Sequence, residues 1–93
     1  MFEKDIERRM REMVRQRGGL FYKFTSPNAP GVPDRIVITP EGTVWFVELK
    51  AQNGRLSNIQ KFQISELEKR GANVRVVRGL QAATDFIEEV MPI

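Results

Sequence analysis

Two acidic residues of this sequence, Asp34 and Glu48, are predicted to face each other across a β-hairpin. The connection 40–42 reads Pro-Glu-Gly, and a three-residue connection pairs Thr39 with Thr43. Because this register continues along both strands, Asp34 falls opposite Glu48. Directly opposed side chains have Cβ atoms about 4.5–5.5 Å apart, where two like charges repel each other. A bound cation would offset the repulsion, so the pair predicts a metal site.

Lys50 adds a positive charge at the same place. It lies two residues after Glu48, and alternate residues of a strand point to the same face. Carboxylate oxygens suit a hard ion such as Mg²⁺, which takes one or two protein carboxylates together with water and phosphate oxygens. Such an ion polarises a phosphodiester and activates a water, with the lysine near the nucleophile or the developing charge.

Ordinary structural roles explain the same residues. Glu48 and Lys50 fit an ion pair at a strand end, and Asp34 fits a turn residue that follows Pro33. A connection one residue shorter would place Asp34 opposite Leu49, and the two carboxylates would then point to opposite sides of the sheet. The register therefore decides between a metal site and a strand end.

Length and composition exclude several classes of protein. The 93 residues have room for one domain with one core, over residues 1–93, which excludes a barrel enzyme or a two-domain enzyme. The absence of cysteine and histidine excludes disulfide frameworks, Cys/His zinc sites and Ser-His-Asp triads. A net charge of +3 allows a polyanionic partner without requiring one. No apolar run approaches the roughly 18 residues that span a bilayer, so we expect a cytoplasmic protein without membrane contact.

Hydrophobic spacing and turn residues predict the element order αβββαβα. The expected elements are a helix over 5–17, strands over 20–25, 34–39 and 43–50, a helix from the capping box 57–60 to Gly71, a strand over 73–77 and a helix over 80–91. The crossover before the last strand is long enough to return it parallel to the third strand. We therefore expect an α/β fold with a four-stranded mixed sheet flanked by helices. Trp45 and Phe46 fall on opposite faces of the third strand, which predicts core on both faces.

Longer motifs resemble a known family. Pro33-Asp34 and Glu48-Leu49-Lys50 resemble the split motif of the PD-(D/E)xK nuclease superfamily. The stretches GGLFYKFTSPNAPGVPDRIV, TVWFVELKAQNGRLSNIQ and GANVRVVRG together resemble the VRR-NUC family, the virus-type replication-repair nuclease domain, in its small stand-alone phage-like form. The likeness covers nearly the whole chain. It implies a restriction-endonuclease-like αβββαβ core, a Mg²⁺- or Mn²⁺-dependent DNA endonuclease, a homodimer, action on four-way junctions or other branched DNA, and the cytoplasm of a bacterial or phage-infected cell.

The resemblance also assigns roles to individual residues. It implies metal binding at Asp34 and Glu48, with the backbone carbonyl of Leu49 as a further ligand, and it makes Lys50 the catalytic lysine. The superfamily also carries a glutamate on its first helix and, in this family, a glutamine on the helix after the third strand.

The glutamine matches Gln60, and for the helix-one glutamate we choose Glu7, with Glu3 as the alternative. Gln60 also fits a capping box with Ser57, and we expect that one side chain does not easily serve both roles. Helical geometry places Glu7 at the border of the apolar face, with Glu3 on that face near the start of the helix. The alternative for Glu7 is an exposed ion pair with Arg11. We expect Glu7 to support a water or a second metal, and Gln60 to orient Lys50 or the substrate.

Candidate DNA contacts surround the predicted metal site. The uncharged segment 25–32 leads directly to Asp34, and its hydroxyl, amide and glycine groups suit a phosphate backbone, although a rigid turn would look the same. Residues 49–65 include no acid, which predicts a positive rim or an ordinary solvated helix face. The candidate contact residues are Ser26, Asn28, Gly31, Arg55 and Lys61.

Two other functional classes compete with the nuclease. One is a non-catalytic nucleic-acid-binding module on the same fold, and the other is a structural or assembly protein of a phage. The complete Asp/Glu/Lys set argues against the binding module, because pure binding would tolerate loss of the facing carboxylates.

Overall fold

The computed structural model describes residues 1–93 and has the expected order of elements. The elements are α1 (Glu3–Gln16), β1 (Leu20–Lys23), β2 (Arg35–Ile38), β3 (Val44–Lys50), α2 (Asn58–Lys69), β4 (Asn73–Arg78) and α3 (Gly79–Val90). The sheet order is β1-β2-β3-β4, with antiparallel pairs except for β4, which runs parallel to β3. The predicted mixed sheet is therefore confirmed. No helix combines the length and the apolar character that a membrane span requires.

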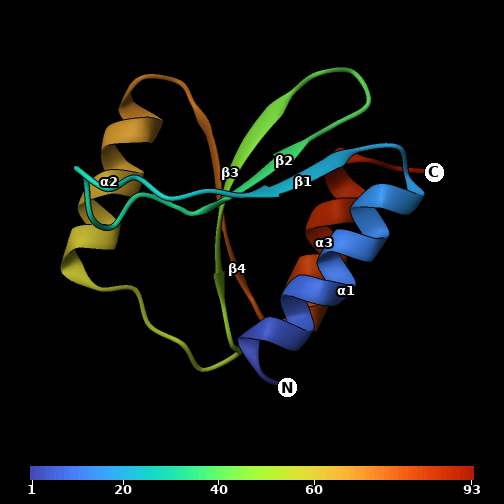
Figure 1. Ribbon diagram of the computed structural model, residues 1–93, viewed down its shortest axis with the longest axis horizontal. Helices are drawn as coiled ribbons and strands as arrows, with labels where there is room; N and C mark the ends of the chain where they lie inside the picture. The colour runs from blue at the N-terminus through green and yellow to red at the C-terminus, as the bar shows by residue number, and fades with distance from the viewer.

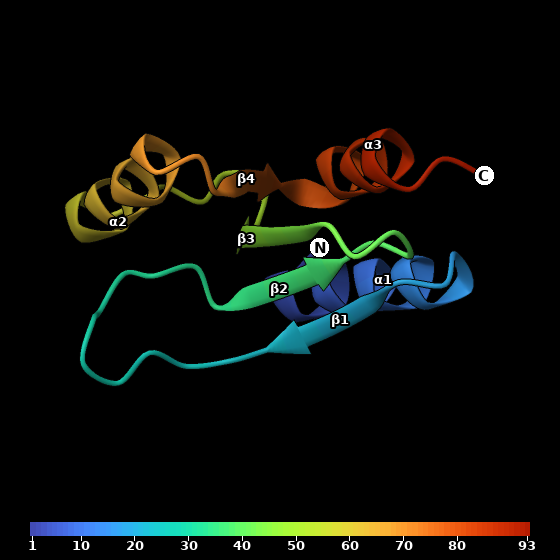
Figure 2. The ribbon, with the colours of Figure 1, turned by 90° about the horizontal axis from the view of Figure 1, so that it is seen from above.

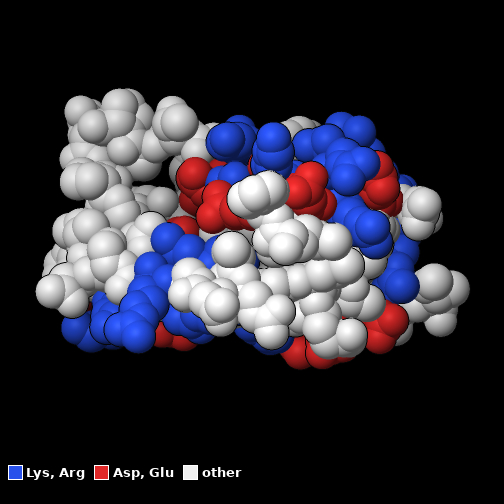
Figure 3. All heavy atoms as spheres, turned by 90° about the horizontal axis from the view of Figure 1, so that it is seen from below, with Lys and Arg blue, Asp and Glu red and all other residues white.

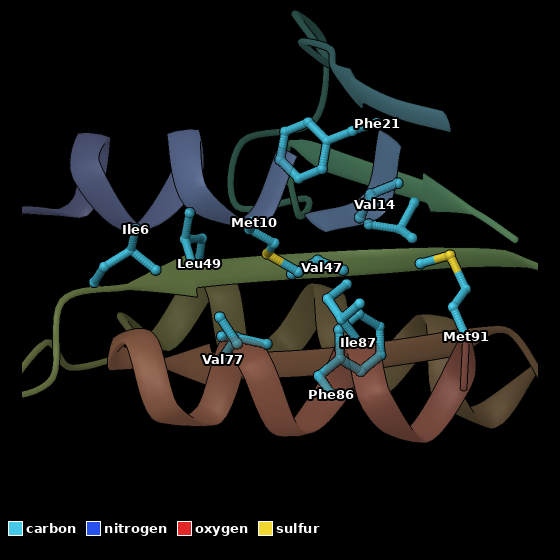
Figure 4. Close-up of a cluster of buried hydrophobic side chains, with 12 residues drawn as sticks. Ile6, Met10, Val14, Phe21, Val47, Leu49, Val77, Phe86, Ile87 and Met91 are labelled. Atoms are coloured by element: carbon cyan, nitrogen blue, oxygen red, sulfur yellow. The ribbon is translucent and has the colours of Figure 1, made fainter. Parts of the chain in front are cut away.

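The helices cover the two faces of the sheet unequally. Helices α1 and α3 lie together on one side and α2 lies on the other side (Figure 1). Figure 4 shows the core between the sheet and the α1/α3 pair, built from side chains of both helices and all four strands. Its buried residues are Ile6, Met10, Val14, Phe21, Val37, Val47, Leu49, Val77, Ala83, Phe86, Ile87 and Met91. The main hydrophobic stabilisation thus lies on the α1/α3 side.

The face toward α2 is only partly covered, which corrects one expectation. Trp45 lies on the α1/α3 face and packs edge-to-face on Phe86, with ring centroids 5.3 Å apart. Phe46 lies on the opposite face, half-buried, with Phe24 at 6.4 Å. Helix α2 packs mainly against β4, so it does not cover the far strands of this face. The residues left most exposed there are Leu20, Tyr22 and Val44.

The β2–β3 hairpin has the predicted register. The Thr39 amide donates to the Thr43 carbonyl at 2.9 Å, and the Gly42 amide donates to the Thr39 carbonyl at 2.8 Å. Gly42 has a φ of +90°, the left-handed conformation that a three-residue turn of this kind requires. Ile36 pairs with Phe46, and the same register places Asp34, the residue just before β2, opposite Glu48.

The connection between β1 and β2 extends away from the sheet and reaches α2 (Figure 2). Gly31, in this loop, has a φ of +88°, and a Cβ there would lie 2.8 Å from the backbone carbonyl carbon and oxygen of Ile59. The loop therefore rests on the first turn of α2. This contact fixes the path of the chain into Asp34.

Gly31→Ala should destabilise the protein more than the matched change Gly42→Ala. Both glycines have a positive φ, which costs a non-glycine residue roughly 1–2 kcal/mol. Gly42 has no atom within 4 Å of its added Cβ, whereas Gly31 meets the Ile59 backbone. Overpacking adds about 1–3 kcal/mol at Gly31 only. Urea unfolding of both variants measures the difference, and equal losses would contradict the contact between the loop and α2.

Candidate active site

Glu48 and Lys50 point to the sheet face toward α2. Val47 and Leu49 alternate with them along β3 and fill the core on the other face. The Lys50 Nζ lies 3.7 Å from the Glu48 Oε2. Glu48 is 7% exposed, so its charge is held in a largely desolvated position. The strand therefore brings a buried carboxylate and an ammonium together at its end.

The carboxylate of Glu48 is influenced by its burial and by the charges of its neighbours, which include Asp34. Burial raises the pKa of Glu48, and Lys50 acts in the opposite direction. The negative charges of Asp34 and Glu3 raise the pKa of Glu48 further. The ionised form of Glu48 is therefore disfavoured, mainly because the carboxylate is buried and in part because other carboxylates lie near it.

The loop after β3 holds the stem of Lys50. Gly54 lies so close that a Cβ there would be 3.0 Å from the Lys50 Cβ. The Arg78 Nε donates to the Gly54 carbonyl at 3.1 Å, and Arg78 is also the partner of Lys50 in the β3–β4 register. The Lys50 side chain is 18% exposed, so most of it is covered.

Gln60 forms the capping box and also reaches Glu48, two arrangements that we expected one side chain not to combine easily. Its side-chain Oε1 accepts from the backbone amide of Ser57 at 2.9 Å, and its backbone amide donates to the Ser57 Oγ at 3.2 Å, which completes the capping box. Its Nε2 donates to the Glu48 Oε2 at 3.5 Å. A carboxamide has separate acceptor and donor atoms, and here each atom takes one role.

Arg35 is the residue of this region that the sequence reasoning missed. Its guanidinium pairs with Asp34 and binds both oxygens of Glu7, at 3.0 and 3.3 Å. The Glu3 Oε2 lies 3.7 Å from the Arg35 Nη2. A signal was present in the sequence, because Arg35 shares its strand face with Val37, and a cation at such an inward position requires partners.

The helix-one glutamates therefore reach the site through Arg35. Glu7 commits both oxygens to the guanidinium and does not pair with Arg11. The negative charge of Glu3 also acts on Glu48, because it contributes to the raised pKa of that residue. Both glutamates of α1 thus border the predicted metal site, and the choice between them for a direct role remains a prediction.

The candidate ligands suit an ion such as Mg²⁺, which needs few protein ligands, better than an ion that only protein groups enclose. No group of three or more acidic side chains lies close enough to enclose an ion. Asp34 and Glu48 supply two carboxylates, and Mg²⁺ commonly binds one or two of these and completes its shell with water and phosphate. Leu49 has its side chain in the core, so it has only a backbone carbonyl to offer.

The predicted DNA contacts lie on the elements around this site. Asn28, Arg55 and Lys61 are exposed, and Ser26 and Gly31 are half-buried. Gly31 lies against Ile59 in the first turn of α2, two residues before Lys61. Figure 3 shows the end of the molecule that contains the start of α1 and the loop after β3, where acidic side chains gather among Lys and Arg side chains. A polyanion approaching this end would meet basic groups around an acidic centre.

Comparisons with known proteins agree with this geometry. The model of the VRR-NUC domain family matches residues 4–81. The chain is 40% identical over 75 residues to "Putative nuclease p44" of Acyrthosiphon pisum secondary endosymbiont phage 1, a match that covers 81% of each protein. A solved structure described as a VRR_NUC domain superposes with a TM-score of 0.84 at 33% identity, over 92% of this chain and 94% of the other.

Glu48→Gln should raise the melting temperature of the metal-free protein at neutral pH. Because the pKa of Glu48 is raised, its ionised form costs stability above that pKa, and the cost disappears as the pH falls below the ordinary glutamate value. The gain of the variant over the wild type should therefore shrink on acidification. Thermal unfolding in EDTA at several pH values measures it.

Glu89→Gln is the matched control with the opposite sign. Arg75 lowers the pKa of Glu89 through a hydrogen bond, so loss of that charge should not stabilise the protein. A Glu48→Gln variant that is less stable than the wild type at neutral pH would contradict the electrostatic account.

Proposed function

The chain belongs to the VRR-NUC domain family, and from this premise we propose that it is a divalent-metal-dependent DNA endonuclease that hydrolyses phosphodiester bonds. One observation carries the proposal. The β2–β3 register places Asp34 opposite Glu48 on the sheet face toward α2, and the Lys50 Nζ lies 3.7 Å from the Glu48 Oε2. The family name and the phage relative support a nuclease, and the residues at the site support the metal.

In this proposal Asp34 and Glu48 hold Mg²⁺ or Mn²⁺, and the Leu49 carbonyl is a further ligand. When bound, the ion supplies a polarised phosphate and a water of lowered pKa. The cation would add to Arg35 and Lys50 in offsetting the charge of the two opposed carboxylates. Mn²⁺ accepts the same oxygen ligands, so both ions suit the site.

The neighbouring side chains orient the reacting groups. Lys50 assists the attacking water or stabilises the charge that develops on the phosphate, and its covered stem limits the positions of its ammonium. Gln60 holds the Glu48 oxygen that faces Lys50 and thereby orients both groups. Glu7 supports a water or a second metal from the α1 side, next to Arg35.

Substrate and assembly follow from the same surface. We propose contacts to the DNA backbone from Ser26, Asn28, Gly31, Arg55 and Lys61, and a preference for four-way junctions or other branched DNA, in replication, repair or recombination in the cytoplasm of a bacterial or phage-infected cell. We also propose a homodimer, which the uncovered apolar residues of the α2 side, Leu20, Tyr22 and Val44, support. Sedimentation of the purified protein measures the assembly.

Replacement of the metal ligands should separate binding from cleavage. Asp34→Asn or Glu48→Gln should lower cleavage of labelled junction, flap and duplex DNA by more than about 100-fold, which exceeds the usual effect of losing a residue that only orients a ligand. Lys50→Ala should reduce cleavage by about 100-fold or more and retain most DNA binding, because it removes a catalytic group rather than the metal. Glu41→Gln, on the distant hairpin turn, is the charge-matched control.

Calcium distinguishes the endonuclease from a non-catalytic binding module. Ca²⁺ binds oxygen ligands and would screen Asp34 and Glu48 from the DNA phosphates, so it should tighten DNA binding by the wild type but not by a doubly substituted Asp34→Ala, Glu48→Ala protein. Binding that is indifferent to Ca²⁺, with no DNA form cut in Mg²⁺ or Mn²⁺, would favour the binding module instead.

Ser57→Ala and Gln60→Ala should separate the two roles of Gln60. Ser57→Ala removes only the side-chain cap and should cost about 1 kcal/mol of stability while cleavage persists. Gln60→Ala also removes the hydrogen bond to Glu48 and should lower the cleavage rate. Chemical unfolding and single-turnover cleavage measure the two effects. Equal cleavage by both variants would show that Gln60 acts only in the capping box.

A further inference from the structure

Arg35 carries a charge into the protein interior beside the proposed metal site. Its side chain is 5% exposed, and it lies on the same strand face as the buried Val37, toward α1. A guanidinium in such a position is costly unless every part of it is paired. The partners of Arg35 therefore determine whether its buried charge is balanced.

Three carboxylates surround this one guanidinium. The Nε and Nη2 bind the two oxygens of Glu7 as a fork, the Nη1 pairs with one oxygen of Asp34, and the Nη2 lies 3.7 Å from Glu3. Burial by itself lowers the pKa of Arg35, and Glu7 and Asp34 together outweigh that effect. The guanidinium thus connects α1 to the residue that precedes β2.

We propose that Arg35 is a positioning residue for the metal: it fixes the Asp34 carboxylate by one oxygen, so that the other oxygen is presented to the ion. This inference rests on the proposed function. It also explains the difference between the acidic neighbours, because Glu7 uses both oxygens on Arg35 whereas Asp34 uses only Oδ1. In this arrangement Glu7 also holds the guanidinium in place, in addition to the role proposed for it above.

The planar geometry of arginine is what this role requires. Its donors lie in a fixed plane and can bind one carboxylate as a fork while a third nitrogen serves another group. A lysine would keep the positive charge but not the two fixed directions. Arg35→Lys therefore tests the geometry of the donor groups. The positive charge, which by itself would weaken metal binding, stays the same in this variant.

The chain offers a matched control in Arg75. Its guanidinium binds both oxygens of Glu89, at 3.0 and 2.7 Å, and so connects β4 to α3 as Arg35 connects β2 to α1. Neither Arg75 nor Glu89 belongs to the proposed site. Arg75→Lys thus shows what the loss of an arginine fork between sheet and helix does to stability alone.

The experiment measures Mn²⁺ binding to the full chain by titration calorimetry without DNA, and the Mg²⁺ dependence of cleavage. Arg35→Lys should weaken Mn²⁺ binding by about tenfold, the usual effect of losing a residue that orients a metal ligand, and should raise the half-saturating Mg²⁺ concentration similarly. At saturating Mg²⁺ the KM for DNA should be unchanged. Glu7→Gln, which keeps the shape of the side chain, should shift metal binding in the same direction by a smaller factor. Arg75→Lys should leave metal binding at the wild-type value.

Two results would overturn the role of Arg35 without affecting the proposed function. One is wild-type Mn²⁺ affinity in both Arg35→Lys and Glu7→Gln, and the other is an equal loss of affinity in Arg75→Lys. In either case the wild type would still bind Mn²⁺ in a manner that depends on Asp34, and would still cut DNA. If the wild type neither binds Mn²⁺ nor cuts DNA, both the proposed function and the role of Arg35 are rejected.

Discussion

The register between β2 and β3 is the constraint on which the site depends. A side chain on a strand changes face with every one-residue shift, so Asp34 and Glu48 share a face only if the turn has the correct length. Gly42 permits the left-handed conformation that closes the turn, and Thr39 and Thr43 pair beside it. The chemistry proposed for one end of the hairpin is thus fixed by the backbone conformation at the other end.

Charge balance is the second requirement, and the fold meets it only in part. Four carboxylates and two cationic groups gather around the proposed metal position: Glu3, Glu7, Asp34, Glu48, Arg35 and Lys50. This leaves an excess of two negative charges, which equals the charge of one divalent cation. The start of α1 favours its own acidic residues through the helix dipole, and Arg35 neutralises part of the rest. Burial is the main cause of the raised pKa of Glu48, and the negative charges of Asp34 and Glu3 add to it.

The sequence predicted what depends on local rules and missed what depends on packing between distant elements. Turn length predicted the β2–β3 register, which places Asp34 opposite Glu48 one residue beyond the Arg35–Val47 pair, and the capping box predicted the start of α2, because both are set by a few adjacent residues. The contact of Gln60 with Glu48 requires the first turn of α2 to reach the end of β3, which only the family resemblance indicated and no local pattern specifies. The role of Arg35 likewise depends on how α1 packs against β2.

The incomplete cover of the sheet follows from where the proposed chemistry lies. On the face toward α2, successive cross-strand rows run from Leu20, Ile38 and Val44, through Tyr22, Ile36 and Phe46, to Phe24, Asp34 and Glu48. A helix that buried all of these rows would also hide the carboxylates and Lys50 from a phosphate backbone. The stabilising core is therefore concentrated under α1 and α3, where all the buried apolar residues of the main cluster gather. On the face toward α2, access to the site limits how much apolar surface is buried. The opposite face, under α1 and α3, therefore provides most of the hydrophobic stabilisation.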